Sequence, residues 1–109
     1  MSQWVKVAAV QDVSESQARV VEANGQRIAL SRVESQVYAI QDVCTHDGGP
    51  LAEGTFWGEE IECPRHGARF DLATGRAVRM PAIVGIKTYS VAVVEGWICI
   101  DVPEVVHEN

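Results

Sequence analysis

Four side chains that can bind a metal lie in two short stretches of the 109-residue chain. Cys44 and His46 belong to CTHDGGPL, and Cys63 and His66 belong to CPRHGARF, with sixteen residues between the two pairs. The whole chain has three cysteines and three histidines, so these stretches hold four of its six thiol and imidazole groups. Thiolate sulfur and imidazole nitrogen bind zinc and iron–sulfur clusters. The two stretches therefore predict one site with two sulfur and two nitrogen ligands.

Two kinds of metal centre fit this ligand set. A structural zinc ion takes four tetrahedral ligands, but zinc fingers usually pair cysteine with cysteine and histidine with histidine, next to a helix. Here each stretch mixes the two residue types, and no helical pattern follows. The alternative is a 2Fe–2S cluster with cysteines on one iron and histidines on the other. The spacing favours the cluster and leaves zinc as the competing hypothesis.

Small residues follow each pair of candidate ligands. The first stretch continues with Gly-Gly-Pro at 48–50, and the second with Gly-Ala at 67–68. Glycine lets the backbone approach a cofactor and point N–H groups at it, and proline fixes the shape of a loop. Gly48 and Gly67 are therefore expected to lie beside the cluster.

The rest of the chain has mostly period-two patterns, which indicate short β-strands. Strands are predicted at 4–10, 18–23, 27–32, 36–42, 87–94 and 97–102, and shorter strands within 55–63 and 68–80. Turn signals lie at 24–26 and at Glu95-Gly96. Cys99 alternates with apolar residues, so it is expected to be buried rather than to bind metal. Strands recurring about every ten residues favour an all-β antiparallel sandwich or barrel.

The length favours a single domain, residues 1–109. The middle of the chain, about 43–85, holds most of the glycines and three of the four prolines. This segment is expected to form a small loop-rich lobe that binds the cluster. The two ends, about 1–42 and 86–109, are expected to form the β framework that carries it.

The formal net charge is −6 and the isoelectric point is near 4.9. An acidic chain repels phosphate backbones, so no nucleic-acid partner is expected. No apolar run approaches the roughly eighteen residues that a membrane span needs, and no signal peptide is visible. Free thiols suit a reducing compartment. These features predict a cytoplasmic protein with no membrane partner.

The two boxes CTH and CPRHG resemble the Rieske signature, and most of the chain resembles the small Rieske-type ferredoxins of bacterial aromatic-ring-hydroxylating dioxygenase systems. The resemblance implies a Rieske fold and one 2Fe–2S cluster, with Cys44 and Cys63 on one iron and His46 and His66 on the other. The later segment RMPAIVGIKTYSV is similar to the family's proline loop, which implies that Pro81 lies near the cluster.

The respiratory-chain Rieske proteins differ from this sequence at four positions that affect the reduction potential. They join their two loops by a disulfide, and the matching positions here are Gly49 and Arg65. They also place a serine and a tyrosine hydroxyl as donors to the cluster sulfurs, and the matching positions here are Ala68 and Phe70. Donors stabilise the reduced cluster, so their loss predicts a potential at the low end of the Rieske range.

The resemblance implies an electron carrier rather than an enzyme. A terminal oxygenase needs a further iron held by two histidines and a carboxylate, and only His107 would remain for that site. A reductase needs a nucleotide fold, and no G-x-G-x-x-G motif is present. The expected role is to carry electrons from an NAD(P)H-dependent ferredoxin reductase to a terminal Rieske oxygenase in aromatic hydrocarbon catabolism. The alternative is the Rieske small subunit of an assimilatory nitrite reductase.

Overall fold

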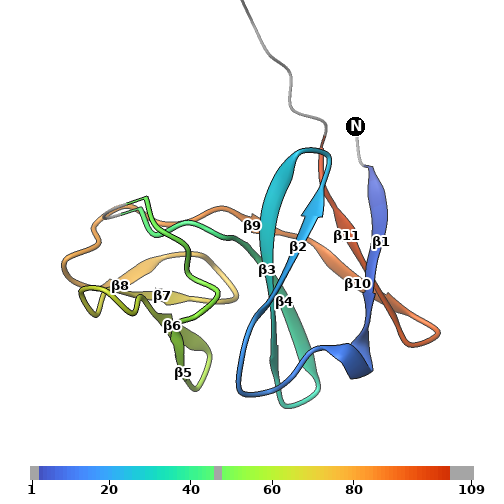
Figure 1. The fold of residues 1–109 in the computed structure, drawn as a ribbon, viewed down its shortest axis with the longest axis horizontal. Coiled ribbons are helices and arrows are strands. Elements are labelled where there is room, and N and C mark those ends of the chain that lie inside the picture. The colour runs from blue at the N-terminus through green and yellow to red at the C-terminus, as the bar shows by residue number, and fades with distance from the viewer. Residues whose placement is uncertain (1–2, 46–47, 104–109) are drawn as a thin grey trace, which may run out of the picture.

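The computed structural model of the protein describes residues 3–45 and 48–103, and strands within these ranges form three antiparallel sheets (Figure 1). The first sheet has the order β1 (Trp4–Ala9), β11 (Trp97–Asp101), β10 (Val91–Val94). The second has the order β2 (Arg19–Ala23), β3 (Gln26–Val33), β4 (Gln36–Gln41), β9 (Thr88–Tyr89). The third has the order β5 (Thr55–Trp57), β6 (Glu60–Glu62), β7 (Arg69–Asp71), β8 (Ala77–Arg79).

The helical content of the described residues is one 3-10 turn, η1 (Val10–Asp12). The prediction of an all-β antiparallel fold is therefore confirmed. No helix in the described part of the chain has the length and apolar character needed to cross a membrane.

Two hairpins form where the sequence has its turn signals. Asn24 and Gly25 connect β2 to β3 with φ angles of 50° and 77°, and Glu95 and Gly96 connect β10 to β11 with 50° and 82°. A two-residue turn with positive φ at both positions matches the right-handed twist of the paired strands. Glycine at the second position of each turn adopts that conformation without a steric penalty.

The predicted single strand over 87–94 is wrong, because the chain changes sheets within it. Thr88 and Tyr89 pair with β4 in the second sheet, whereas Val91–Val94 pair with β11 in the first. Ser90 lies between them and accepts a backbone hydrogen bond from Asp101 at 3.1 Å. A period-two pattern identifies extended backbone but not its partner, so the sequence could not show this change.

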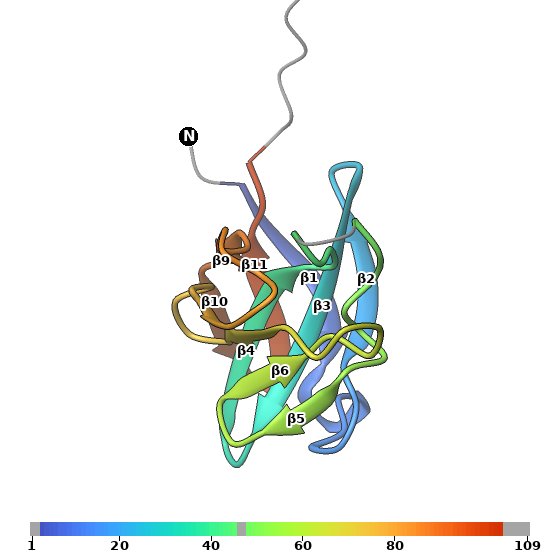
Figure 2. The same cartoon turned by 90° about the vertical axis from the view of Figure 1, so that its left-hand side faces the viewer.

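The first two sheets pack face to face, and β3 and β4 have a second buried face. Ile28 and Leu30 of β3 join a core with Ile98 and Ile100 of β11. Ala29, which points to the other side of β3, joins a second core formed mainly by residues of 44–86. The third sheet covers that side, and Figure 2 shows β5 and β6 in front of β3 and β4. The two cores together connect all three sheets.

Candidate metal centre

The two cysteines of the paired stretches lie in the second core. Cys44 follows β4, Cys63 follows β6, and they are 0% and 1% exposed. Ala68 and Phe70, both fully buried, belong to the same core cluster. Neither cysteine forms a disulfide. The fold therefore brings two buried thiols, nineteen positions apart in sequence, into one apolar environment.

The two loops that begin at these cysteines have the same backbone hydrogen bonds. In the first loop, the N–H of Cys44 donates to the Gly49 carbonyl at 2.7 Å, and the N–H of Gly48 donates to the Cys44 carbonyl at 2.7 Å. In the second loop, Cys63 N–H donates to the Ala68 carbonyl at 2.7 Å, and Gly67 N–H donates to the Cys63 carbonyl at 3.1 Å. Each loop therefore closes on its own cysteine in the same way.

Gly48 and Gly67 occupy the same place in these two loops. Their φ angles are 77° and 76°, a region that side-chain-bearing residues rarely adopt. A Cβ atom at either position would have no heavy atom within 4 Å among the described residues. These glycines are thus required by the turn of the backbone and leave open space beside it.

The second loop places an imidazole at the surface. His66 is exposed, three residues after the buried Cys63. His46, the expected ligand of the first loop, lies outside the described residues. Among the described residues no three His, Cys, Asp or Glu side chains form a group that could hold a metal ion. Two thiols on the core side and an imidazole on the solvent side suit a metal centre that lies between the apolar core and solvent.

Asp42 fastens the first loop to the strand that precedes it. Its buried carboxylate accepts backbone hydrogen bonds from Leu51 at 2.8 Å and Ala52 at 2.9 Å. Its other oxygen lies 3.1 Å from the guanidinium of Arg27, which is 57% exposed. One carboxylate therefore joins the two ends of the loop that starts at Cys44. Asp42 was not among the residues predicted from the sequence, although a carboxylate ending the apolar strand YAIQD is a signal for it.

The expected proline loop lies beside the loop that begins at Cys44. It runs from β8 to β9, contains a cis Met80–Pro81 peptide, and leaves Pro81 half-buried. The hydroxyl of Thr45, next to Cys44, donates to the Val84 carbonyl. Ala82 and Ile86 bury their side chains in the core that contains the two cysteines. The loop is therefore fixed to the candidate centre at several points.

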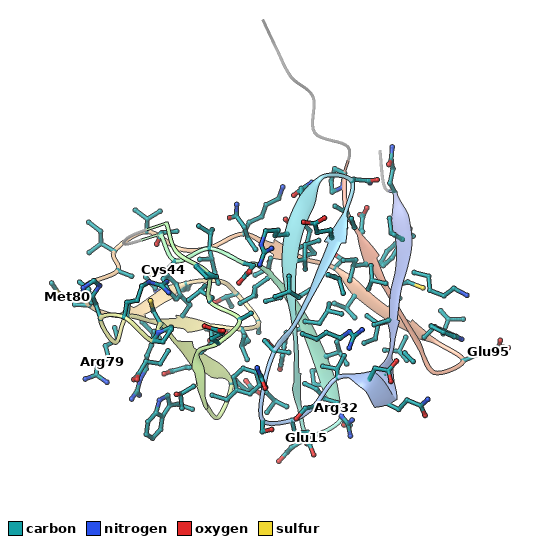
Figure 3. The ribbon with its side chains drawn as sticks, viewed as in Figure 1. Glu15, Arg32, Cys44, Arg79, Met80 and Glu95 are labelled. Atoms are coloured by element: carbon teal, nitrogen blue, oxygen red, sulfur yellow. The ribbon has the colours of Figure 1, made fainter. Side chains whose placement is uncertain are left out.

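The outer side of the proline loop is apolar and exposed. Met80, Ile83 and Val84 are 74%, 83% and 61% exposed. Figure 3 shows Met80 with Cys44 at one end of the molecule and Glu95 at the opposite end. Three large apolar side chains are therefore exposed to solvent at this end.

The third cysteine is not part of this arrangement, but it is less buried than expected. Cys99 is partly exposed, because β11 turns Ile98 and Ile100 toward the core and Cys99 toward the other face. There it pairs with Lys6 of β1 and Ala92 of β10.

The described residues thus form an all-β fold with two similar loops, each beginning at a buried cysteine, and the second loop also carries an exposed imidazole. The profile of the Rieske 2Fe-2S domain matches residues 3–90, and the chain belongs to this family, whose cofactor is one 2Fe–2S cluster.

Relatives of known function are similar over most of their length. The ferredoxin component of the naphthalene 1,2-dioxygenase/salicylate 5-hydroxylase systems of Ralstonia sp is 41% identical over 90 residues, covering 83% of this chain and 86% of the relative. The structure of a complex of reduced oxygenase and oxidized ferredoxin in carbazole 1,9a-dioxygenase contains a chain with a TM-score of 0.85 and 36% identity. That alignment covers 95% of this chain and 97% of the other.

A putative small subunit of an NADPH nitrite reductase is a more distant structural relative. It has a TM-score of 0.79 and 26% identity, and the alignment covers 90% of this chain and 97% of the other. The fold is thus shared between carriers and enzyme subunits, whereas the sequence is closer to the ferredoxin components.

Proposed function

We propose that this protein is a Rieske ferredoxin that carries single electrons from an NAD(P)H-dependent reductase to a terminal oxygenase of an aromatic-ring-hydroxylating system. It would act as the electron-transfer component rather than as the enzyme. The observation that carries the proposal is the pair of loops with matching backbone bonds, which present two buried thiols and an exposed imidazole. The ferredoxin components of dioxygenase systems among its relatives support it.

In this proposal Cys44 and Cys63 bind one iron and His46 and His66 bind the other. The cluster, when bound, accepts and releases one electron without breaking a bond of the protein. Burial of the two thiols keeps water and oxidants from the sulfur ligands. The exposed side of His66 would face a docked partner. Gly48, Gly67 and Pro81 would shape the protein around the cluster.

We propose that the end of the molecule bearing Met80, Ile83 and Val84 is the docking face. Side chains exposed by 61–83% gain contact area when a partner covers them. Gly48, Pro50 and Pro64, all exposed, add small and rigid contacts nearby. Electron-transfer partners use interfaces below about 1,200 Å², which this small face can supply.

The same proposal covers organisation and location. Residues 1–109 would form one domain, with a base from about 1–42 and 86–109 and a cluster-binding lobe from about 43–85. A cytoplasmic location suits the three cysteines that remain free of disulfides among the described residues. The rival function, a nitrite reductase small subunit, rests on the more distant structural likeness.

Spectroscopy of ligand variants tests the cofactor and its ligands. The purified protein should be coloured, contain acid-labile sulfide, and give a Rieske electron paramagnetic resonance signal after dithionite reduction. Cys63→Ala and His66→Ala should abolish that signal, and Cys99→Ser should retain it. A colourless protein with zinc and no sulfide would overturn the proposal.

A second experiment tests the partners. The protein should be reduced by a ferredoxin reductase and reoxidised by a ring-hydroxylating oxygenase. Electron delivery only within a nitrite reductase complex would favour the rival function.

A further inference from the structure

A side chain of the second ligand loop crosses to the first. Arg65, directly before His66, donates a hydrogen bond from Nη2 to the Pro50 carbonyl at 3.0 Å. Its guanidinium also lies against Gly49. A Cβ atom built on Gly49 would be 2.5 Å from Cζ and 2.7 Å from both Nε and Nη2 of Arg65. The planar group therefore occupies the space that any other residue at 49 would need for its side chain.

The two neighbouring glycines of the first loop serve different purposes. Gly48 has a φ of 77°, and a Cβ there would meet none of the described residues within 4 Å, so it is the backbone conformation that requires glycine. Gly49 lies outside that φ region, and the crowding there comes from the Arg65 guanidinium alone among the three nearest atoms. Glycine at 49 thus makes room for a contact between the loops.

We propose that Arg65 is a positioning residue that clamps the two ligand loops together through Gly49 and Pro50. The clamp joins the two positions that carry the disulfide in the respiratory proteins. A guanidinium keeps its charge at all accessible pH values and is not changed by reductants. The loops would therefore stay joined in a reducing compartment, where a disulfide would open.

The clamp also fixes a positive charge in the residue next to His66. A cation stabilises the more negative, reduced form of a nearby redox centre and raises its midpoint potential. This part of the inference rests on the proposed cluster. The contact between the loops does not, because it joins Arg65 directly to Gly49 and to the Pro50 carbonyl.

Four variants of the cluster-loaded protein separate the clamp from the charge. Arg65→Ala removes both the contact between the loops and the charge. Arg65→Lys keeps the charge but lacks the planar guanidinium. Gly49→Ala displaces the guanidinium from its place and leaves the charge in the chain. The double variant Gly49→Ala/Arg65→Ala completes a double-mutant cycle. Arg76→Ala, which removes another exposed arginine of the lobe, is the matched control.

The first measurement is the rate at which a chelator bleaches the visible absorbance. Losing a hydrogen bond of ordinary net strength should speed bleaching about threefold to tenfold in Arg65→Ala, Arg65→Lys and Gly49→Ala. The control should bleach at the wild-type rate. Gly49→Ala should have no further effect when Arg65 is already alanine. Additive effects of the two substitutions, or unchanged bleaching in Gly49→Ala, would overturn the clamp.

The second measurement is the midpoint potential of the same proteins. Arg65→Ala should lower it, and Arg65→Lys should keep it closer to the wild-type value, although both bleach faster. Equal potentials in all variants would overturn the role of the charge. The spectrum of the wild-type protein is recorded first, and the absence of a cluster signal would refute the proposed function. A cluster whose bleaching rate is unchanged by these substitutions would refute only the clamp.

Discussion

The carboxylate of Asp42 accepts the backbone N–H of Leu51 at 2.8 Å and so closes a loop that contains Cys44. The same oxygen accepts Ala52 N–H at 2.9 Å, and the side chain is fully buried. The loop ends are therefore held by the protein itself. If Cys44 binds the cluster as proposed, these bonds help to position it.

Replacing Asp42 should lower the stability of the fold substantially. Asp42→Ala leaves two buried N–H groups without an acceptor, each of which costs about 1–3 kcal/mol. We expect the free energy of unfolding to fall by about 2 kcal/mol or more, measured by urea unfolding followed by circular dichroism. Arg27→Gln removes only the partly exposed ion-pair partner and should cost less than about 1 kcal/mol. Equal losses in the two variants would contradict the central role of the loop bonds.

Gly75 should tolerate alanine less well than Gly25. Both glycines have a φ of 77°, so alanine carries the same conformational penalty of about 1–2 kcal/mol at each. At Gly75 the Cβ would also lie 2.1 Å from the Ile86 carbonyl, where the proline loop ends, whereas at Gly25 it would meet no atom of the described residues within 4 Å. Overpacking should add about 1–3 kcal/mol for Gly75→Ala. Thermal loss of the visible absorbance measures both variants, and matching losses would contradict the steric argument.

Adding hydroxyl groups beside the buried cysteines should raise the midpoint potential. Ala68→Ser and Phe70→Tyr introduce donors where the fully buried side chains have none. If each stabilises the reduced form by about 1 kcal/mol more than the oxidised form, the potential rises by roughly 40 mV per donor. Ala29→Ser, in the same core cluster, is the control and should leave the potential unchanged. Voltammetry of the four proteins measures this, and unchanged potentials in both donor variants would refute it.

A charge on the proposed docking face should slow electron delivery. Ile83 is 83% exposed, so Ile83→Asp should leave the fold and spectrum intact. Burying an unpaired carboxylate at a partner's surface should lower the second-order rate of electron transfer to the oxygenase about tenfold or more. Val94→Asp is the matched control, since Val94 is 55% exposed and lies next to Glu95 at the opposite end of the molecule (Figure 3). Stopped-flow reoxidation gives both rates, and a similar slowing by the two substitutions would place docking elsewhere.

Both tyrosines should ionise at unusually high pH. Burial raises the pKa of Tyr89, whose hydroxyl donates to the Gln26 side chain at 2.6 Å. Burial, and then the negative charge of Glu59, raise the pKa of Tyr38. Because each pKa is higher in the folded state than in the unfolded one, the stability gained is fully present below about pH 10 and is lost as the pH rises through the folded pKa.

Ultraviolet difference absorbance of the folded protein should therefore show tyrosinate forming above the ordinary range. Tyr89→Phe should remove one of the two transitions and make unfolding free energy less dependent on pH in the alkaline range. If both tyrosines ionised with the pKa of a solvent-exposed tyrosine, the burial argument would be contradicted.

The sequence predicted the chemistry of the candidate site better than the contacts that hold the site in place. Cysteine and histidine in mixed pairs predicted the iron–sulfur class, and period-two patterns predicted most strands, because residue type and local spacing determine both. The single strand over 87–94 was wrong because extended backbone can pair with either of two sheets. Cys99 proved partly exposed because it lies on the face of β11 opposite to the buried Ile98 and Ile100.

By itself, the sequence determined the class of cofactor, the turns that need glycine and the all-β class, since each depends on residues a few positions apart. The tertiary structure decided that β3 is buried on both faces, that Asp42 closes the first loop, and that Arg65 lies on Gly49. These contacts join residues that are separated along the chain. Their formation depends on how the three sheets pack and on which buried backbone groups then need a hydrogen-bond partner. Local sequence patterns encode neither.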